Sequence, residues 1–129
     1  MRAKMSVLLI AAILVVCVPV NAHHSFAAVF DVDTSVAVSG TVTKVEWMNP
    51  HAWIYIDVGD GSGSSDNWAF ELGSPNGLMR RGWTRKSIQV GDAISVAGYR
   101  ARDGSNRGNV KSIVLADGTE LTGMSSRDN

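Results

Sequence analysis

Cysteine is almost absent from this sequence, so disulfides are not available to stabilise the fold. Among 129 residues there is one cysteine, Cys17, and it lies within an apolar run near the N-terminus. A single cysteine forms neither an intramolecular disulfide nor a paired CxxC zinc motif, so the hydrophobic core must suffice even in an oxidising compartment. Val16 precedes Cys17, whereas a lipoprotein attachment site needs a small residue there, and lipidation is therefore not expected.

An excess of positive charge is also missing. The chain has 12 Lys and Arg against 12 Asp and Glu, whereas a nucleic-acid-binding protein needs a concentrated basic surface that displaces counterions from phosphates. The densest basic cluster consists of Arg80, Arg81, Arg85 and Lys86. We interpret this cluster as a solvated helix end, and contact with an anion or a partner is the alternative. Nucleic acid is not an expected partner.

Residues that carry enzyme catalysis are scarce. The only histidines are His23, His24 and His51, and no serine lies in a glycine-rich nucleophile turn. The sequence also lacks a glycine-rich loop of the kind that cradles phosphates. One pair of carboxylates, Asp57 and Glu71, is expected on adjacent outward strand faces. We predict that the protein is not an enzyme, and a hydrolase that uses this pair is the least favoured alternative.

Only one long apolar run is present, over residues 7–18. It is shorter than the roughly 20 apolar residues that a bilayer-spanning helix needs. Arg2 and Lys4 precede this run and small or medium residues up to Ala22 follow it, which is the pattern of a secretory signal peptide. We predict that residues 1–22 are removed, that the mature protein is periplasmic or secreted from a bacterium, and that it keeps no membrane span.

The predicted mature chain of 107 residues is long enough for one domain with its own core. Ser74 as the N-cap and Pro75 at the first helical position predict a short helix that Gly82 ends. We expect residues 23–35 to form an N-terminal arm, residues 36–122 the domain and residues 123–129 a disordered tail. Alternation of apolar and polar residues predicts strands over residues 36–47, 52–58, 67–72, 93–101 and 109–115.

The order of these elements predicts the fold class. Three strands, one short helix and two strands (β-β-β-α-β-β) are the elements of an OB-fold, a small Greek-key barrel. Gly40, within the long first strand, indicates a bend of the kind found at a barrel corner. We therefore expect an all-β fold with one short helix, arranged as an OB-fold-like barrel, and an open β-sandwich is the alternative.

Two of the three histidines would open the mature protein. His23, as residue one, offers its free amine and its ring nitrogen to one metal ion, a chelate that suits copper in tetragonal nitrogen coordination. His24, as residue two, permits a second geometry through the amine, the intervening amide and its own ring. His51, at the corner after Asn49-Pro50, is a candidate third ligand. The alternative is that these histidines belong to a tail and a turn.

Aromatic side chains on the predicted second strand form the other candidate site. Trp53 and Tyr55 alternate with its aliphatic residues and are expected on the outward face, with Trp47 nearby and Glu71 beside them on the third strand. Such a face suits a glycan, a peptide or a protein, because ligands of OB-folds usually lie across strands two and three. The alternative is that the helix or the N-terminal arm covers these rings as ordinary packing.

Four segments carry a family resemblance: residues 23–27 (HHSFA), 45–51 (VEWMNPH), 73–76 (GSPN) and 82–83 (GW). In combination they resemble a family of small exported bacterial proteins that is catalogued as a domain of unknown function. The resemblance extends over nearly the whole mature chain. It implies an exported, barrel-like domain, and it brings no established activity, ligand or catalytic residue.

The leading hypothesis is therefore an exported, non-enzymatic binding module that holds copper through His23 and its amine, with His24 or His51. The alternative is a metal-free module that binds a glycan, a peptide or a protein over Trp53 and Tyr55.

Overall fold

The computed structural model describes residues 26–123. The predicted signal peptide, His23, His24 and residues 124–129 of the predicted tail lie outside the described residues. Gly123, where that tail was predicted to begin, is buried, and its amide donates a hydrogen bond to the Lys111 carbonyl. The described fold therefore extends one residue beyond the predicted end of the domain.

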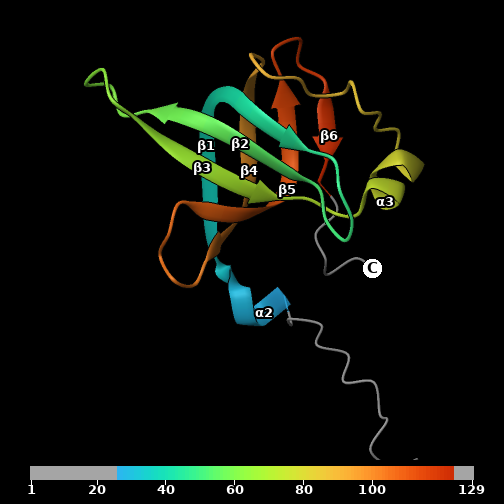
Figure 1. The fold of residues 1–129 in the computed structure, drawn as a ribbon. Coiled ribbons are helices and arrows are strands. Elements are labelled where there is room, and N and C mark those ends of the chain that lie inside the picture. The colour runs from blue at the N-terminus through green and yellow to red at the C-terminus, as the bar shows by residue number, and fades with distance from the viewer. Residues whose placement is uncertain (1–25, 124–129) are drawn as a thin grey trace, which may run out of the picture.

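Strands dominate the described chain, which confirms the mostly-β class (Figure 1). The four later predicted strands appear within two residues of their expected bounds, the first strand begins six residues early, and the predicted helix is α3. The four-residue helix α2 was not predicted, and β6 follows a hairpin turn at Asp117-Gly118 that the turn residues of the sequence indicate. The elements of residues 26–123 are α2 (Phe26–Val29), β1 (Phe30–Glu46), β2 (Trp53–Gly59), β3 (Ser65–Glu71), α3 (Pro75–Arg80), β4 (Ala93–Ala101), β5 (Arg107–Leu115) and β6 (Glu120–Thr122).

The first strand begins inside the segment that was predicted to be an arm. Phe30 pairs with Ala101 of β4, and the ladder then shifts register between Asp31 and Ser35 before it continues along the predicted strand. Strand pairing with β4, which local alternation does not reveal, thus draws these residues into the sheet. The phenyl ring of Phe30 is buried as a result.

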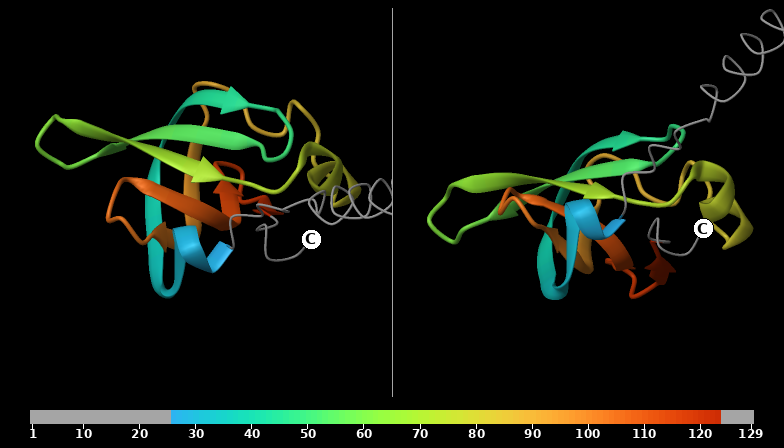
Figure 2. Two further views of the ribbon diagram at one scale, coloured as in Figure 1. Left: turned by 60° about the horizontal axis from the view of Figure 1, so that its bottom comes forward. Right: turned by 90° about the horizontal axis from the view of Figure 1, so that it is seen from below.

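The strands form one sheet whose hydrogen bonding closes into a ring. The sheet order is β3-β2-β1-β4-β5-β6, and β3 also pairs with β5. The β3–β5 pairing is parallel and joins Ala69 to Arg107, Phe70 to Gly108 and Glu71 to Asn109. The strands therefore follow one another around the ring as β1, β2, β3, β5 and β4, with β3 and β5 brought side by side (Figure 2).

Two glycines let strands approach closely within this ring. A Cβ atom on Gly40 of β1 would overlap the carbonyl of Asp57 in β2, and a Cβ atom on Gly98 of β4 would overlap the carbonyl of Asn109 in β5. A side chain at either position would therefore force the neighbouring strand to shift. At Gly40, the site of the predicted bend, β1 is paired with β4 and then turns onto β2.

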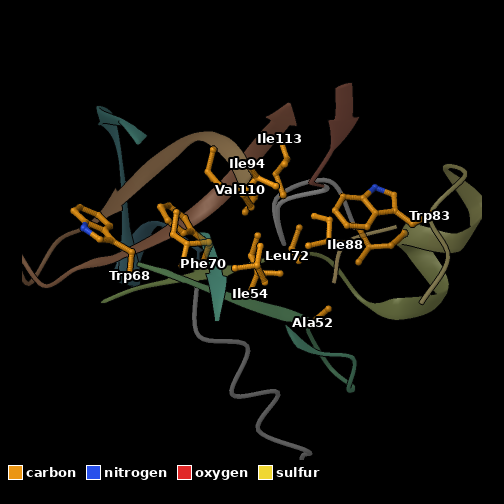
Figure 3. Close-up of a cluster of buried hydrophobic side chains, with 14 residues drawn as sticks. Ala52, Ile54, Trp68, Phe70, Leu72, Trp83, Ile88, Ile94, Val110 and Ile113 are labelled. Atoms are coloured by element: carbon orange, nitrogen blue, oxygen red, sulfur yellow. The ribbon is translucent and has the colours of Figure 1, made fainter. Parts of the chain in front are cut away.

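The hydrophobic core fills the inside of the ring. Ile54 and Ile56 of β2 are fully buried, as their alternation with Trp53 and Tyr55 predicts, and Phe70 of β3 is fully buried opposite them. Trp68 and Trp83 lie at opposite ends of this core (Figure 3). Burial of each large apolar side chain contributes about 1.5–3 kcal/mol, so the core can hold the fold without disulfides.

Helix α3 closes one end of the ring. The Ser74 hydroxyl accepts a hydrogen bond from the Gly77 amide (3.2 Å), Pro75 occupies the first turn, and Gly82 follows the helix with a φ of 92°. These are the predicted N-cap, first-turn proline and terminating glycine. Leu78 of the helix is fully buried, which ties the helix to the core. Among residues 26–123, no helix is both long and apolar enough to cross a membrane.

Candidate functional site

A row of four side chains crosses the outer face of the ring. Tyr99 of β4 pairs with Asn109 of β5, Asn109 pairs with Glu71 of β3, and Glu71 pairs with Trp53 of β2. Residues that pair across neighbouring strands point to the same side of a sheet. Their strand neighbours, such as Phe70, are in the core, so these four residues, which we call the cross-strand row, face outward.

The only histidine within the described residues is His51, and it contacts Glu71 of the cross-strand row. The Nδ1 atom of His51 lies 2.5 Å from Oε1 of Glu71. The backbone around the contact is fixed, because the Ala52 amide donates to the Gly73 carbonyl (3.0 Å) and the Leu72 amide donates to the Ala52 carbonyl (2.9 Å). The side chain of Glu71 is 10% exposed and that of His51 is 27% exposed. A buried carboxylate thus holds one ring nitrogen of a histidine that solvent still reaches.

Glu71 is not the solvent-exposed carboxylate that its place in the strand pattern predicts. It does lie beside Trp53, but the parallel pairing with β5 sets Asn109 against its other side and buries it. Burial raises the pKa of Glu71, and the charges of His51 and Arg107 oppose this shift. The ionised form of Glu71 therefore depends on these two neighbours.

Asp57 and Glu71 do not form the carboxylate pair considered for a hydrolase. Asp57 pairs with Asn67 of β3, whereas Glu71 pairs with Trp53, four positions away along the ladder. At roughly 3.3 Å per residue this separates the two backbone positions by about 13 Å. Asp57 instead accepts a hydrogen bond from the Asn67 side-chain amide (2.7 Å). Paired glycosidase carboxylates are closer than this, at roughly 5–9.5 Å.

A second polar cluster surrounds Tyr55 on the same outer face. The Tyr55 hydroxyl donates to Oε2 of Glu46 (3.0 Å), Lys44 forms an ion pair with Glu46, and the Lys44 ammonium lies 5.0 Å from the centre of the Tyr55 ring. Burial, followed by the hydrogen bond to Glu46, raises the pKa of Tyr55, while hydrogen bonds from Lys44 and Tyr55 lower the pKa of Glu46. This cluster is not among the predicted sites, although Lys44 and Glu46 alternate on the outward side of their strand.

The aromatic rings predicted as a ligand face have different surroundings. Trp53 and Tyr55 are both half-buried on the outer face, and the Arg107 guanidinium lies 5.5 Å from the centre of the Trp53 ring. Trp47 follows the outward-facing Glu46, so it turns to the other side, where it is partly buried and packs against the core. Trp53, Tyr55 and Glu71 are thus grouped on one face, and Trp47 packs inward.

The predicted copper ligands are only partly within the described chain. His51 is described, while His23 and His24 lie outside residues 26–123. Within those residues, no three His, Cys, Asp or Glu side chains gather closely enough to hold a metal ion. A metal site with three such side chains that includes His51 would therefore take at least one of them from outside the described residues.

Asn109 is the residue of this region that the sequence analysis did not single out. It is 0% exposed, and neither its side-chain nitrogen nor its side-chain oxygen has a hydrogen-bond partner in the described part of the chain. Such an unpaired buried amide is unfavourable and uncommon. Its place in the predicted fifth strand gives no sign of this environment, which arises from the β3–β5 pairing.

The closed sheet with a flanking helix defines a small, mostly-β domain. Comparison with known families shows which family the domain belongs to. The family model of DUF6152, a family of unknown function, matches residues 11–111. The chain belongs to this family, which confirms the resemblance seen in its sequence. No curated protein matches the chain.

One solved structure with some similarity is the crystal structure of the ZRD-deleted mutant of TiaS in complex with agmatine. It has 19% sequence identity to this chain and a TM-score of 0.42, and the alignment covers 71% of this chain and 23% of that one. The chain thus spans about a quarter of the length of that protein.

Proposed function

We propose that this protein is an exported, non-enzymatic copper-binding module built on an OB-fold-like Greek-key barrel. The ring of β1, β2, β3, β5 and β4, with α3 between the third and fourth strands, supports this fold assignment. The signal-peptide pattern of residues 1–22 supports export. Copper is favoured by the histidine chemistry at the start of the predicted mature chain.

The contact between His51 and Glu71 carries the metal proposal. Histidines that bind metals almost always donate their other ring N–H to a carboxylate, a carbonyl or water, which fixes the tautomer and the ring orientation. Glu71 lies 2.5 Å from Nδ1 of His51, so it is positioned to serve as that partner. With Nδ1 held in this way, Nε2 is the nitrogen available to a metal ion.

The remaining ligands are proposed to come from the mature N-terminus. Cleavage after Ala22 gives His23 a free amine, which chelates together with its own imidazole, or His24 completes the alternative chelate through the intervening amide. Together with Nε2 of His51, either arrangement offers an all-nitrogen set suited to Cu(II). Copper binding then requires both correct processing and an intact His51.

Binding of a glycan, a peptide or a protein on the aromatic face is the second candidate. Trp53 and Tyr55 lie together there, but each ring already has a cation close to its face. The Arg107 guanidinium lies over the Trp53 ring and the Lys44 ammonium over the Tyr55 ring. A stacking ligand would have to share or displace these cations. This observation favours the metal over the aromatic face as the first function to test.

The test is a copper titration by calorimetry on protein exported and processed in bacteria, with the N-terminal residue confirmed by mass spectrometry. Three samples are compared: the processed protein, a form with one extra residue before His23, and the processed His51→Ala variant. We expect the processed protein to bind one Cu(II) ion with submicromolar affinity. The extended form and His51→Ala should each bind at least tenfold more weakly.

Equal, weak binding by all three samples would contradict the copper proposal. The aromatic face would then be the next candidate site. Loss of affinity in the extended form alone would retain the terminal amine as a ligand and remove His51 from the site. Circular dichroism of each sample checks that the fold is unchanged.

A further inference from the structure

We propose that the end of α3 and the turn after it dock this protein on a membrane surface of anionic lipid. The docking surface is the segment of residues 79–86, which we call the basic segment. It consists of an exposed apolar side chain, Met79, followed by the cations Arg80, Arg81, Arg85 and Lys86. This inference goes beyond the proposed function and depends neither on copper nor on the aromatic face.

The first observation is the concentration of unneutralised positive charge. Residues 72–91 contain these cations and no Asp or Glu, although the whole chain has 12 residues of each sign. All of the cations are exposed, and none of the ion pairs in the described part of the chain involves them. The acidic residues that bound the stretch are engaged elsewhere, since Glu71 contacts His51 and the Asp92 carboxylate accepts a hydrogen bond from the Gln89 amide (2.8 Å).

The second observation is that the backbone of this region is fixed, with its cations facing outward. Trp83 and Ile88 are buried and reach into the core (Figure 3). The Trp83 indole Nε1 donates to the Thr122 carbonyl (3.0 Å), and the Thr84 amide donates to the Ser87 hydroxyl (2.8 Å). A preorganised surface loses little conformational freedom when it binds, so the basic segment can dock without first having to fold.

The third observation distinguishes a membrane from a soluble acidic partner. The side chain of Met79 is 47% exposed, beside the buried Leu78, and it directly precedes Arg80. Cations alone attract any polyanion, whereas an apolar side chain next to them can enter the boundary between lipid headgroups and acyl chains. The guanidinium and ammonium groups then bind the lipid phosphates. The combination of cations with an exposed methionine therefore favours an anionic lipid surface.

The strength of the attraction follows from the number of cations. Each Lys or Arg close to an anionic membrane strengthens binding about fivefold. Four such residues together strengthen it by several hundred-fold, on the order of 5 × 5 × 5 × 5. We therefore expect reversible attachment that salt weakens, because ions screen the charges of an exposed surface.

The docking is tested by sedimentation of the processed protein with lipid vesicles in the presence of a metal chelator. One set of vesicles contains phosphatidylcholine alone, and the other contains phosphatidylcholine mixed with anionic phosphatidylglycerol. We expect binding to the mixed vesicles only, and we expect it to weaken steadily as salt is added.

Substitutions then assign the binding to the basic segment. Lys86→Gln should weaken binding to the mixed vesicles about fivefold. The exposed Lys111 of β5 lies outside the segment and provides the matched control, and Lys111→Gln should change binding by less than about twofold. Met79→Ser should weaken vesicle binding at least about threefold through loss of its apolar contact. It should leave binding to soluble polyglutamate unchanged. Circular dichroism verifies that each variant is folded.

Three results would overturn the docking. They are equal binding to both kinds of vesicle, equal effects of Lys86→Gln and Lys111→Gln, and vesicle binding that Met79→Ser leaves unchanged. The last result, together with tight binding to polyglutamate, would indicate an acidic protein partner instead of a membrane. The copper titration uses none of these residues, so either proposal can fail while the other stands.

Discussion

Glu71 and Asn109 lie opposite each other on β3 and β5, the parallel strand pair that closes the ring. This pairing buries both side chains, although one carries a carboxylate and the other an amide without a partner among the described residues. Ring closure thus buries two polar groups, and one of them, Glu71, contacts His51. The candidate site follows from this closure, since β3 without β5 would leave Glu71 open to water.

The first prediction concerns the role of Glu71 in holding His51. Glu71→Gln preserves the size of the side chain and removes its charge, so it should weaken Cu(II) binding by about 10–100-fold, the usual effect of losing the outer partner of a ligating histidine. Calorimetry on the processed protein measures this change. Glu120→Gln on the exposed side of β6 is the matched control and should bind as the unaltered protein does. Equal affinities in the two variants would remove Glu71 from the site.

The second prediction concerns the close approach of β4 and β5. A Cβ atom on Gly98 would overlap the Asn109 carbonyl, whereas a Cβ atom on Gly59 at the end of β2 meets nothing within 4 Å. Gly98→Ala should therefore lower the free energy of unfolding by about 1–3 kcal/mol or more, as overpacking does. Gly59→Ala should be neutral or slightly stabilising. Urea unfolding of both variants makes the comparison, and similar midpoints would contradict the described strand spacing.

The third prediction concerns the ionisation of Tyr55. Burial and the hydrogen bond to Glu46 raise its pKa above the ordinary value of 10.0. In a Tyr99→Phe background, ultraviolet titration should report a single tyrosine that ionises above pH 10.0. Glu46→Gln should lower this pKa and leave part of the shift, because burial is its larger cause. Since folding favours the neutral phenol, stability from this group is complete below the unfolded pKa and is lost as the pH rises through the folded one.

A pKa of Tyr55 at or below the ordinary value would show that its hydroxyl is not held by Glu46. Far-ultraviolet circular dichroism across the same pH range verifies that the titration reports the folded protein.

The fourth prediction concerns the core that replaces disulfides in this protein. Phe70 is fully buried and stacks on Trp68 with ring centres 5.8 Å apart. Phe70→Ala should therefore lower the free energy of unfolding by about 3–5 kcal/mol. Val90 is 67% exposed, and Val90→Ala should cost under about 0.5 kcal/mol. Chemical denaturation measures both, and a small loss in Phe70→Ala would show that this ring is not central to the core.

The sequence by itself determined the local elements of this protein. Alternation with period two identified the strand that carries Ile54 and Ile56 in the core and Trp53 and Tyr55 outside. Ser74, Pro75 and Gly82 marked both ends of α3, because capping is a property of a few neighbouring residues. Family membership also followed from short segments of the chain.

Only the tertiary structure decided which outward-facing residues stay exposed to solvent and which contact one another. The alternation that points Glu71 outward holds, but the parallel strand β5 then covers it, and no local pattern specifies a partner some 40 positions away in the chain. The contact of His51 with Glu71, the unpaired amide of Asn109 and the closeness of Phe26 to the row depend on the pairings β2–β3, β3–β5 and β1–β4, respectively. Side-chain periodicity fixes the face of a strand, whereas burial and charge on that face depend on which strand lies beside it.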